Sequence, residues 1–190
     1  MKSIKLIVLT MSVAFIGLLS SANAQTKYFT REGKVQFYSK APLEEITGLN
    51  KKATSVLDTE NGQIEFSILM KAFEFEKALM MEHFNENYVE SSKFTKAVFK
   101  GVIDNKAEVN WKKDGAYLVK ISGKMSLHGE TNDHSAEGTI FIKGGAISGH
   151  SEFNIALKDY KIEIPSLVKD KVSEVVKVTV DLNYEMLKPN

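Results

Sequence analysis

The side chains best suited to chemistry in this sequence are a few histidines and their acidic neighbours. His83 and Glu86, or Glu82 and Glu86, fall within one turn of a predicted helix and could bind a metal ion together. A protein zinc site needs at least three side-chain ligands, and no third candidate stands at a suitable spacing. We therefore predict no metal site, and we expect His83 to take part in packing.

A second group of polar residues surrounds a predicted turn. His128 and His134 flank this turn and could face each other across a hairpin, with Asp133 beside them, so that one imidazole could act as a general base. A position at the end of a strand suits a turn-stabilising role better, because Gly129 can supply the positive φ that a tight turn requires. We predict a structural rather than a catalytic role for this group.

Motifs for nucleophilic or phosphate chemistry are missing from the sequence. Ser151 follows a glycine at position 149, but a hydrolase nucleophile elbow requires a second glycine where this chain has Phe153. Gly144 and Gly145 fit a hairpin turn, and the chain has no G-x-G-x-x-G or Walker pattern. The absence of cysteine excludes thiolate catalysis and cysteine-ligated metal centres. We predict a protein without enzymatic activity and without a cofactor.

The elements that position these residues follow a period of two. From Val176 to Met186 every even position is apolar and every odd position is polar, which is typical of a half-buried strand. The segments 117–127 and 147–157 repeat this pattern. Further strands are predicted at 34–41, 52–59, 63–72, 96–104 and 136–143.

Turn residues separate the predicted strands: Asn61-Gly62, Asp114-Gly115, the pentad Gly129–Asp133 and Gly144-Gly145. Strands joined by tight turns are antiparallel neighbours. A sheet of about eight such strands with one apolar face can close into a barrel and so lose its exposed edges. A β-sandwich is the alternative architecture. The long predicted strands favour an all-β, eight-stranded antiparallel barrel instead.

One segment departs from the period of two. Residues 76–87 place Leu79, Met80, His83 and Phe84 on one face of a short helix. The helix lies in a connection of about twenty residues, and connections of this length usually have a function. A second irregular connection covers residues 160–173, where the strand pattern is also lost.

The N-terminal residues 1–24 have the three parts of a secretory signal peptide. Two lysines form a basic start, residues 6–19 form an apolar run, and residues 22–24 form a small-residue cleavage site. The apolar run is shorter than the roughly 20 residues that a membrane-spanning helix needs. We therefore predict cleavage after Ala24, a periplasmic or secreted location, and a mature domain over residues 25–190 without stable membrane insertion.

The charge of the mature chain gives no reason to expect a polyanionic partner. Removal of the signal peptide takes away two lysines and no acidic residue, so the formal net charge changes from +1 to −1. Arg31 is the only arginine in the chain, whereas specific recognition of phosphates and bases relies on the planar guanidinium group. We predict no nucleic-acid partner.

Two stretches carry motifs that occur together in one protein family. Residues Met81–Phe94, followed by Phe99-Lys100-Gly101, match a helix with acidic, histidine and hydrophobic residues, then a loop and a strand of the form Phe-Lys-small. Gly123–Thr131 matches a strand end of the form G-x-L-T-I-H-G-x-T. On these residues the chain resembles the YceI-like family of exported bacterial proteins. Many members carry an Arg-Asp pair before the helix histidine, where this chain has Met80-Met81-Glu82.

The resemblance implies a lipocalin-like barrel that binds a polyisoprenoid or similar long-chain lipid in an apolar cavity. By composition alone, the bulky side chains of this chain would fill a solid core. On the strength of the resemblance, we predict that the ligand contacts bulky, flexible or aromatic side chains and one histidine: Phe66, Ile68, Met70, Phe75, Met80, His83, Phe84, Phe94, Phe99, Met125, Phe153 and Ile155.

The predicted function is therefore that of an exported binding protein that sequesters or carries an isoprenoid or similar long-chain lipid. Two other functions stay open. The chain could be an enzyme that acts on such a lipid, with His83, Glu86 or His128 as acid or base. It could also be a filled barrel whose outer surface binds a protein, and the sequence leaves open whether it forms a homodimer.

Overall fold

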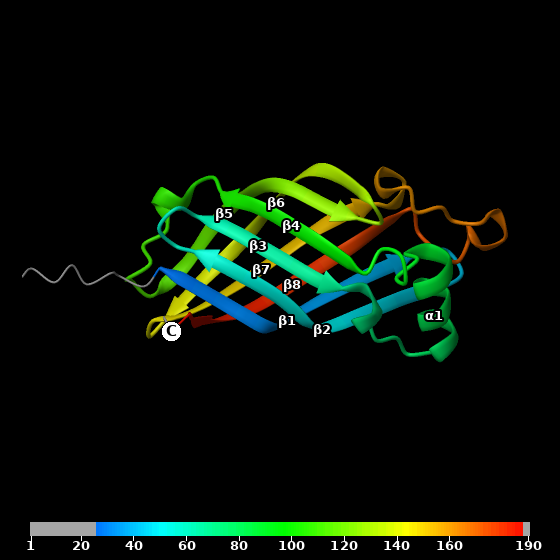
Figure 1. The fold of residues 1–190 in the computed structure, drawn as a ribbon, viewed down its shortest axis with the longest axis horizontal. Coiled ribbons are helices and arrows are strands. Elements are labelled where there is room, and N and C mark those ends of the chain that lie inside the picture. Colours follow the sequence, from blue (N-terminus) through cyan, green and yellow to red (C-terminus); the bar gives the residue numbers. More distant parts are fainter. Residues whose placement is uncertain (1–25, 188–190) are drawn as a thin grey trace, which may run out of the picture.

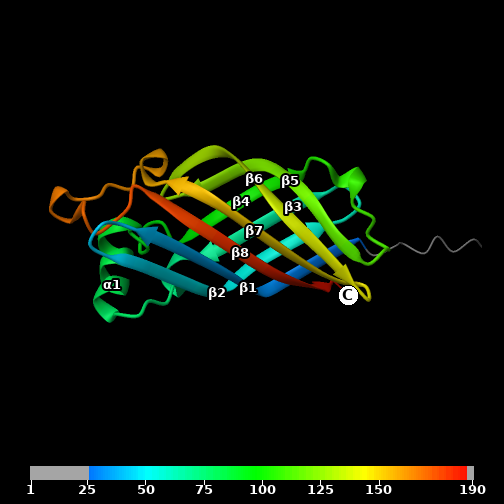
Figure 2. The ribbon, with the colours of Figure 1, turned by 180° about the vertical axis from the view of Figure 1, so that it is seen from behind.

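The computed structural model describes residues 26–187 as a closed barrel of eight antiparallel strands in chain order (Figures 1 and 2). Each strand pairs with the next, and β8 closes the barrel against β1. The strands are β1 (Lys27–Lys40), β2 (Glu45–Asp58), β3 (Gln63–Leu69), β4 (Lys96–Ile103), β5 (Gly115–Leu127), β6 (Glu130–Lys143), β7 (Ala146–Ala156) and β8 (Val175–Met186). The predicted all-β, eight-stranded antiparallel barrel is confirmed.

Alternating side chains explain why this sheet closes. In β8, Val176, Val178, Leu182 and Tyr184 are buried inside the barrel, while most residues between them face outwards. The observed strand agrees with the predicted segment 176–186 to within one residue. β1, β2 and β6 are longer than predicted, because each continues through residues that lack a clear alternation.

The turn between β5 and β6 consists of two residues. His128 and Gly129 both have positive φ, at 51° and 82°, a geometry that matches the twist of the flanking strands. β6 begins directly afterwards, at Glu130. The prediction of a five-residue turn over Gly129–Asp133 is therefore wrong, because residues 130–133 pair with β5 as a strand.

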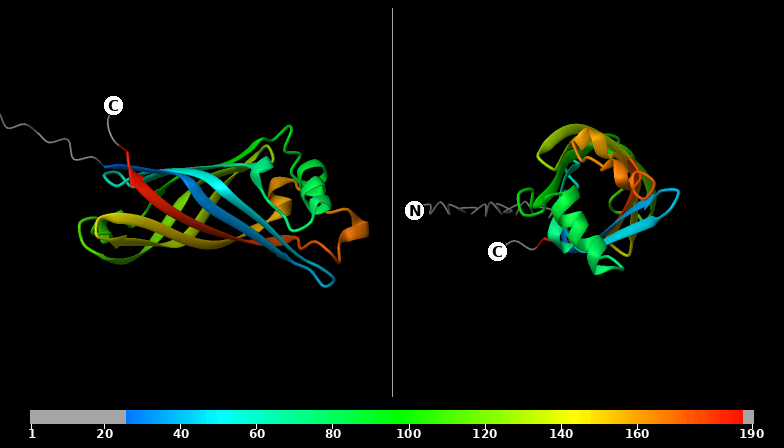
Figure 3. Two further views of the ribbon diagram at one scale, coloured as in Figure 1. Left: turned by 90° about the horizontal axis from the view of Figure 1, so that it is seen from below. Right: turned by 90° about the vertical axis from the view of Figure 1, so that its right-hand side faces the viewer.

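Short helical segments interrupt the strands mainly at one end of the barrel, which we call the helix end. They are η1 (Met70–Ala72), α1 (Ala78–His83) and the π-helical η2 (Phe84–Tyr88) between β3 and β4, and η4 (Leu157–Tyr160) and η5 (Ser166–Val168) between β7 and β8. α1 and the β7–β8 connection lie over the opening of the barrel at this end (Figure 3). The predicted helix over 76–87 is confirmed as α1, continued by η2.

Buried side chains inside the barrel form two clusters. The cluster at the helix end includes Val35, Ile68, Met70, Phe73, Met125, Ile162, Val176 and Val178. The other cluster lies near the β2–β3, β4–β5 and β6–β7 turns, and we call this the packed end. Its members include Leu57, Ile103, Val109, Val119, Ile140, Ile142, Ile147, Leu182 and Tyr184.

The predicted signal peptide over residues 1–24 lies outside the residues that the structure describes, so it stays a prediction. No helix within residues 26–187 combines the length and the apolar character that a bilayer crossing demands.

Candidate ligand-binding cavity

A cavity of about 520 Å³ lies inside the barrel. Residues from all eight strands line it, and α1 and η2 add side chains at the helix end. Most of the wall is apolar, and the volume falls within the range of roughly 300–1,000 Å³ that is usual for small-ligand sites. The interior of the barrel is therefore not a solid core.

Eleven of the residues predicted to contact a ligand line this cavity. They are Phe66, Ile68, Met70, Phe75, Met80, His83, Phe84, Phe99, Met125, Phe153 and Ile155. Their position makes contact with a ligand possible, and the contact itself stays a prediction. Phe94, the remaining predicted residue, does not line the cavity.

Phe94 instead belongs to a structural group around the β5–β6 turn. Its ring centroid lies 4.6 Å from that of His128, and the Lys93 ammonium lies 4.7 Å from the Phe94 ring. The His128 Nδ1 atom is 2.9 Å from the Tyr160 carbonyl oxygen, and its Nε2 atom is 3.0 Å from the Glu90 carboxylate. His128 thus ties the turn to both long connections at the helix end.

His134 lies apart from His128, so the two histidines do not face each other across the hairpin, an arrangement that the sequence had left open. In β6, His134 pairs with Gly123 of β5, and its side chain lines the cavity. Its ring centroid lies 4.7 Å from that of Phe153 and 6.3 Å from that of Phe99. The predicted grouping around the turn therefore separates into a structural histidine and a histidine in the cavity wall.

Aromatic rings close the cavity beneath the helix end. The Phe84 ring stacks on Phe37 at 5.5 Å, and it also meets Phe73 at 5.4 Å and Phe75 at 5.0 Å. Phe37 in turn covers Gly48 directly across from it in β2, where an added Cβ would clash with the ring. Glycine at this position therefore makes room for the aromatic cluster.

The histidine and the acidic residues of the predicted helix are all exposed. His83 lines the cavity, and neither Glu82 nor Glu86 does. Within residues 26–187, no group of three or more histidine, cysteine or acidic side chains stands close enough to hold a metal ion.

The polar atoms of the cavity wall bond mainly to the protein itself. The Tyr184 hydroxyl shares a 2.8 Å hydrogen bond with the Ser55 hydroxyl, and burial raises the pKa of the Tyr184 phenol, which therefore stays neutral. The Ser39 hydroxyl accepts a 2.9 Å hydrogen bond from the Ser173 backbone N–H. These bonds leave a wall that offers a ligand mostly hydrocarbon.

Comparison with known families agrees with this architecture. The model of the YceI-like domain matches residues 27–184. The chain belongs to the YceI-like family. No curated protein matches the chain in sequence.

Several solved YceI-like structures have the same fold. A polyisoprenoid-binding domain from Saccharophagus degradans is 17% identical, with a TM-score of 0.75 over 86% of this chain and 99% of that one. BcnA from Burkholderia cenocepacia is 14% identical, with a TM-score of 0.66 over 80% of this chain and 96% of that one. A YceI protein from Campylobacter jejuni is 15% identical, with a TM-score of 0.51 over 75% of this chain and 85% of that one. At these identities the likeness concerns the fold.

Sequence reasoning missed part of the cavity wall of this YceI-like barrel. Phe37 stands on the inward face of a predicted strand, so the alternation with Val35 could have identified it. Ile162 comes from the irregular connection after β7, where no period marks the inward positions. His134 was not predicted to line the cavity, because its polar neighbours in sequence indicated a turn rather than a strand.

Proposed function

We propose that this chain binds a long-chain, isoprenoid-like lipid inside the barrel, and that it sequesters or carries the lipid without changing it chemically. The observation that carries this proposal is the apolar cavity of about 520 Å³. The Saccharophagus degradans neighbour is described as polyisoprenoid-binding, which supports the same class of ligand.

Hydrophobic burial can supply the affinity. Each CH₂ group that leaves water contributes about 0.8 kcal/mol, so a five-carbon isoprene unit gains roughly 3–4 kcal/mol before ordering costs. A few buried units therefore suffice for tight binding without any charge pairing. This agrees with a wall in which hydrocarbon side chains predominate.

The wall can also adapt to a flexible chain. Met70, Met80 and Met125 line the cavity, and methionine has an unbranched side chain that fits irregular shapes. Met80 stands on α1, which lies over the opening of the barrel. Movement of this helix and its side chains would admit the lipid at the helix end.

We extend the proposal to export, with the lipid bound in the periplasm or outside the cell. Residues 1–24 carry the basic, apolar and small-residue parts of a signal peptide. N-terminal sequencing of exported protein should give Gln25 as the first residue. A protein that starts at Met1 or at another position would contradict the proposed cleavage after Ala24.

Native mass spectrometry tests the ligand class directly. The full chain, expressed with its N-terminal segment and purified from its own envelope, should carry extra mass that organic extraction releases as an apolar long-chain lipid. Purified protein that carries no lipid and that does not bind a fluorescent fatty chain in solution would overturn the proposal. Conversion of the lipid, lost in His83→Ala or His128→Ala, would favour the enzymatic alternative instead.

A cavity-filling substitution tests the location of the ligand. Ala97 lines the cavity, so Ala97→Trp should occupy part of its volume and lower lipid affinity by at least about tenfold. Ala116 on β5 is exposed, so Ala116→Trp adds the same side chain outside the barrel and should leave affinity unchanged. Equal affinities for the two variants would place the lipid elsewhere than in the cavity.

A further inference from the structure

Three exposed leucines project from the helix end of the barrel. Leu43 lies in the β1–β2 turn, Leu79 on α1 and Leu167 on η5, and these residues are 71%, 59% and 94% exposed. Single exposed leucines are common on protein surfaces. These three, however, come from three different connections that lie around one opening of the barrel (Figure 3). They therefore gather at one end of the molecule.

Direct contacts hold the three connections together. The Leu43 backbone N–H donates a 2.9 Å hydrogen bond to the Asp170 carbonyl, which joins the β1–β2 turn to the connection that carries η5. The Lys77 ammonium lies 3.5 Å from the Glu44 carboxylate, which joins the start of α1 to the same turn. The leucines therefore share one rim of the barrel, and we call Leu43, Leu79 and Leu167 the leucine rim.

The leucine rim is continuous with the cavity. Leu79 lines the cavity although it is more than half exposed, so its side chain extends the apolar wall to the outer surface. Glu44, next to Leu43 in sequence, and Val168, next to Leu167, line the same cavity. Each of the three connections thus contributes both to the cavity wall and to the leucine rim.

The charges beside the leucine rim balance each other. Residues 41–44, 77–83 and 165–172 carry three lysines and three acidic residues, so their formal charge is zero with His83 neutral. A surface without net charge does not attract a polyanion, and it does not repel zwitterionic head groups either. Lysine stems can also lie along hydrocarbon while their ammonium groups stay in water. The charge balance is therefore complementary to a zwitterionic lipid surface.

The shape of the leucine rim also favours a bilayer over a protein partner. Leu167 is 94% exposed, so almost nothing in the protein packs around its side chain. A rigid protein partner would need a matching pocket for each projecting leucine, because protein interfaces are closely packed. The boundary between head groups and acyl chains adapts to any shape and takes up each apolar side chain separately.

Resting on the proposed lipid-binding function, we infer that the leucine rim docks the barrel reversibly on a zwitterionic lipid bilayer. The opening at the helix end then faces the membrane, and the lipid passes between bilayer and cavity without crossing water. Each additional CH₂ group lowers the concentration of a free lipid in water about fourfold, so a long-chain lipid is almost absent from water and its source is a membrane. Three leucines bury far less apolar surface than a membrane-spanning helix, which keeps the docking reversible.

Sedimentation with phosphatidylcholine vesicles tests the docking. The native chain should bind these vesicles, with little change between about 0.05 and 0.5 M salt. Leu43 and Leu167 do not line the cavity, so the double variant Leu43→Ser/Leu167→Ser alters the rim alone and should bind vesicles at least about tenfold more weakly. Leu118→Ser, at a 77% exposed position of β5, should bind them as the native chain does. A native chain that binds no vesicles, or equal binding by the double variant, would overturn the inference.

Uptake of a fluorescent fatty chain from the same vesicles tests the role of docking in transfer. The native rate should rise with vesicle concentration, because each transfer requires a collision with a bilayer. The double variant should bind the fatty chain in solution with native affinity but take it up from vesicles at least about tenfold more slowly. Equal uptake rates would overturn the inference. Circular dichroism of each variant establishes that it is folded.

The outcomes separate this inference from the proposed function. A native chain that binds the fatty chain in solution but binds no vesicles leaves the proposed function standing and shows that the docking is wrong. A native chain that binds vesicles but no fatty chain contradicts the proposed function, and with it the role of the rim in transfer. Analytical ultracentrifugation adds a third outcome: a dimer that the double variant loses, without vesicle binding, would mean that the rim contacts a second copy of the chain and would overturn the inference.

Discussion

The packed end and the helix end of the barrel are built from the same strands, yet one is filled with side chains and the other encloses most of a cavity. At the packed end, the β4–β5 connection adds Val109 and Trp111 to the cluster. In the cavity wall, Ala97, Ala136 and Gly138 occupy positions where larger side chains would take up the space. Small residues at these positions therefore help to leave the space that the cavity occupies.

The largest effect is expected at the packed end. Leu57 is 0% exposed and does not line the cavity, so Leu57→Ala removes buried methyl groups and leaves a void. We expect the free energy of unfolding to fall by about 2–5 kcal/mol in urea denaturation. Lipid affinity, measured where the variant is folded, should not change. A loss of less than about 1 kcal/mol would mean that this end is not tightly packed.

The opposite result is expected at the helix end. Met80 lines the cavity, so the carboxylate of Met80→Asp would be desolvated against a bound lipid, whereas in the empty barrel it can turn towards water. Lipid affinity should fall at least about tenfold, while the free energy of unfolding should change much less than in Leu57→Ala. Displacement of a fluorescent fatty chain and the urea midpoint measure the two effects.

The neighbouring residue provides the control for this substitution. Met81 lies on the same helix, is exposed, and does not line the cavity. Met81→Asp should leave both lipid affinity and stability nearly unchanged. If Met80→Asp lowers the urea midpoint as much as Leu57→Ala does, α1 is part of the stable core and the contrast between the two ends is wrong.

Strand positions could be predicted from sequence wherever inward residues were apolar. β8 satisfies this condition along its length, and its predicted limits agree with the structure. The first half of β2 was missed because Gly48 and Asn50 point inwards and break the alternation. Asn50 is nevertheless fully buried, since its amide donates to the Leu69 carbonyl and its side-chain oxygen accepts from the Lys52 N–H. Tertiary hydrogen bonds of this kind leave no periodic signal.

The cavity was harder to predict than the fold. An inward phenylalanine gives the same alternation in sequence whether it fills a core or lines a cavity. Phe66 and Phe99 both line the cavity, but their positions in the sequence are equally compatible with a filled core. The polar run before residue 136 indicated a turn, yet it forms the part of β6 that does not pair with β7. A strand without a partner on one side tolerates polar residues on both faces, and this removes the period of two.

A pH effect is expected from the cavity wall. Burial lowers the pKa of His134 below its ordinary value of 6.5, so below that pH the unfolded chain takes up a proton that the folded chain does not. The contribution of His134 to the free energy of unfolding is therefore fully present above pH 6.5, and it is lost as the pH falls towards the folded-state pKa. His134→Leu lacks this contribution, and the other three histidines are common to both proteins.

Urea midpoints of the native chain and of His134→Leu, compared at pH 8 and pH 5, measure this effect. The native chain should lose more stability on acidification than the variant does. Parallel losses in the two proteins would mean that His134 is open to water, which would remove the contrast between a dry cavity wall and the outer surface of the barrel.

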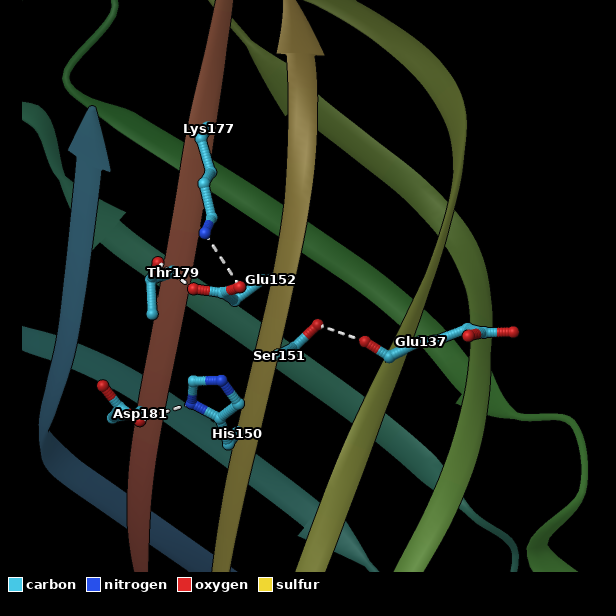
Figure 4. Close-up of polar contacts among 7 residues, drawn as sticks. All are labelled: Glu137, His150, Ser151, Glu152, Lys177, Thr179 and Asp181. Carbon is cyan, nitrogen blue, oxygen red and sulfur yellow. Dashed lines mark hydrogen bonds and ion pairs between the residues drawn. The ribbon is translucent and has the colours of Figure 1, made fainter. Parts of the chain in front are cut away.

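The smallest effect is expected on that outer surface. His150 Nδ1 lies 2.7 Å from the Asp181 carboxylate, across β7 and β8, and both side chains are about half exposed (Figure 4). Exposed ion pairs contribute about 0–1 kcal/mol, because water screens the charges and the side chains lose freedom when they pair. A double-mutant cycle with His150→Ala and Asp181→Ala should therefore give a coupling energy below about 1 kcal/mol. A larger coupling would show that outer-face contacts hold β7 against β8, in which case interior packing alone would not account for the stability of the barrel.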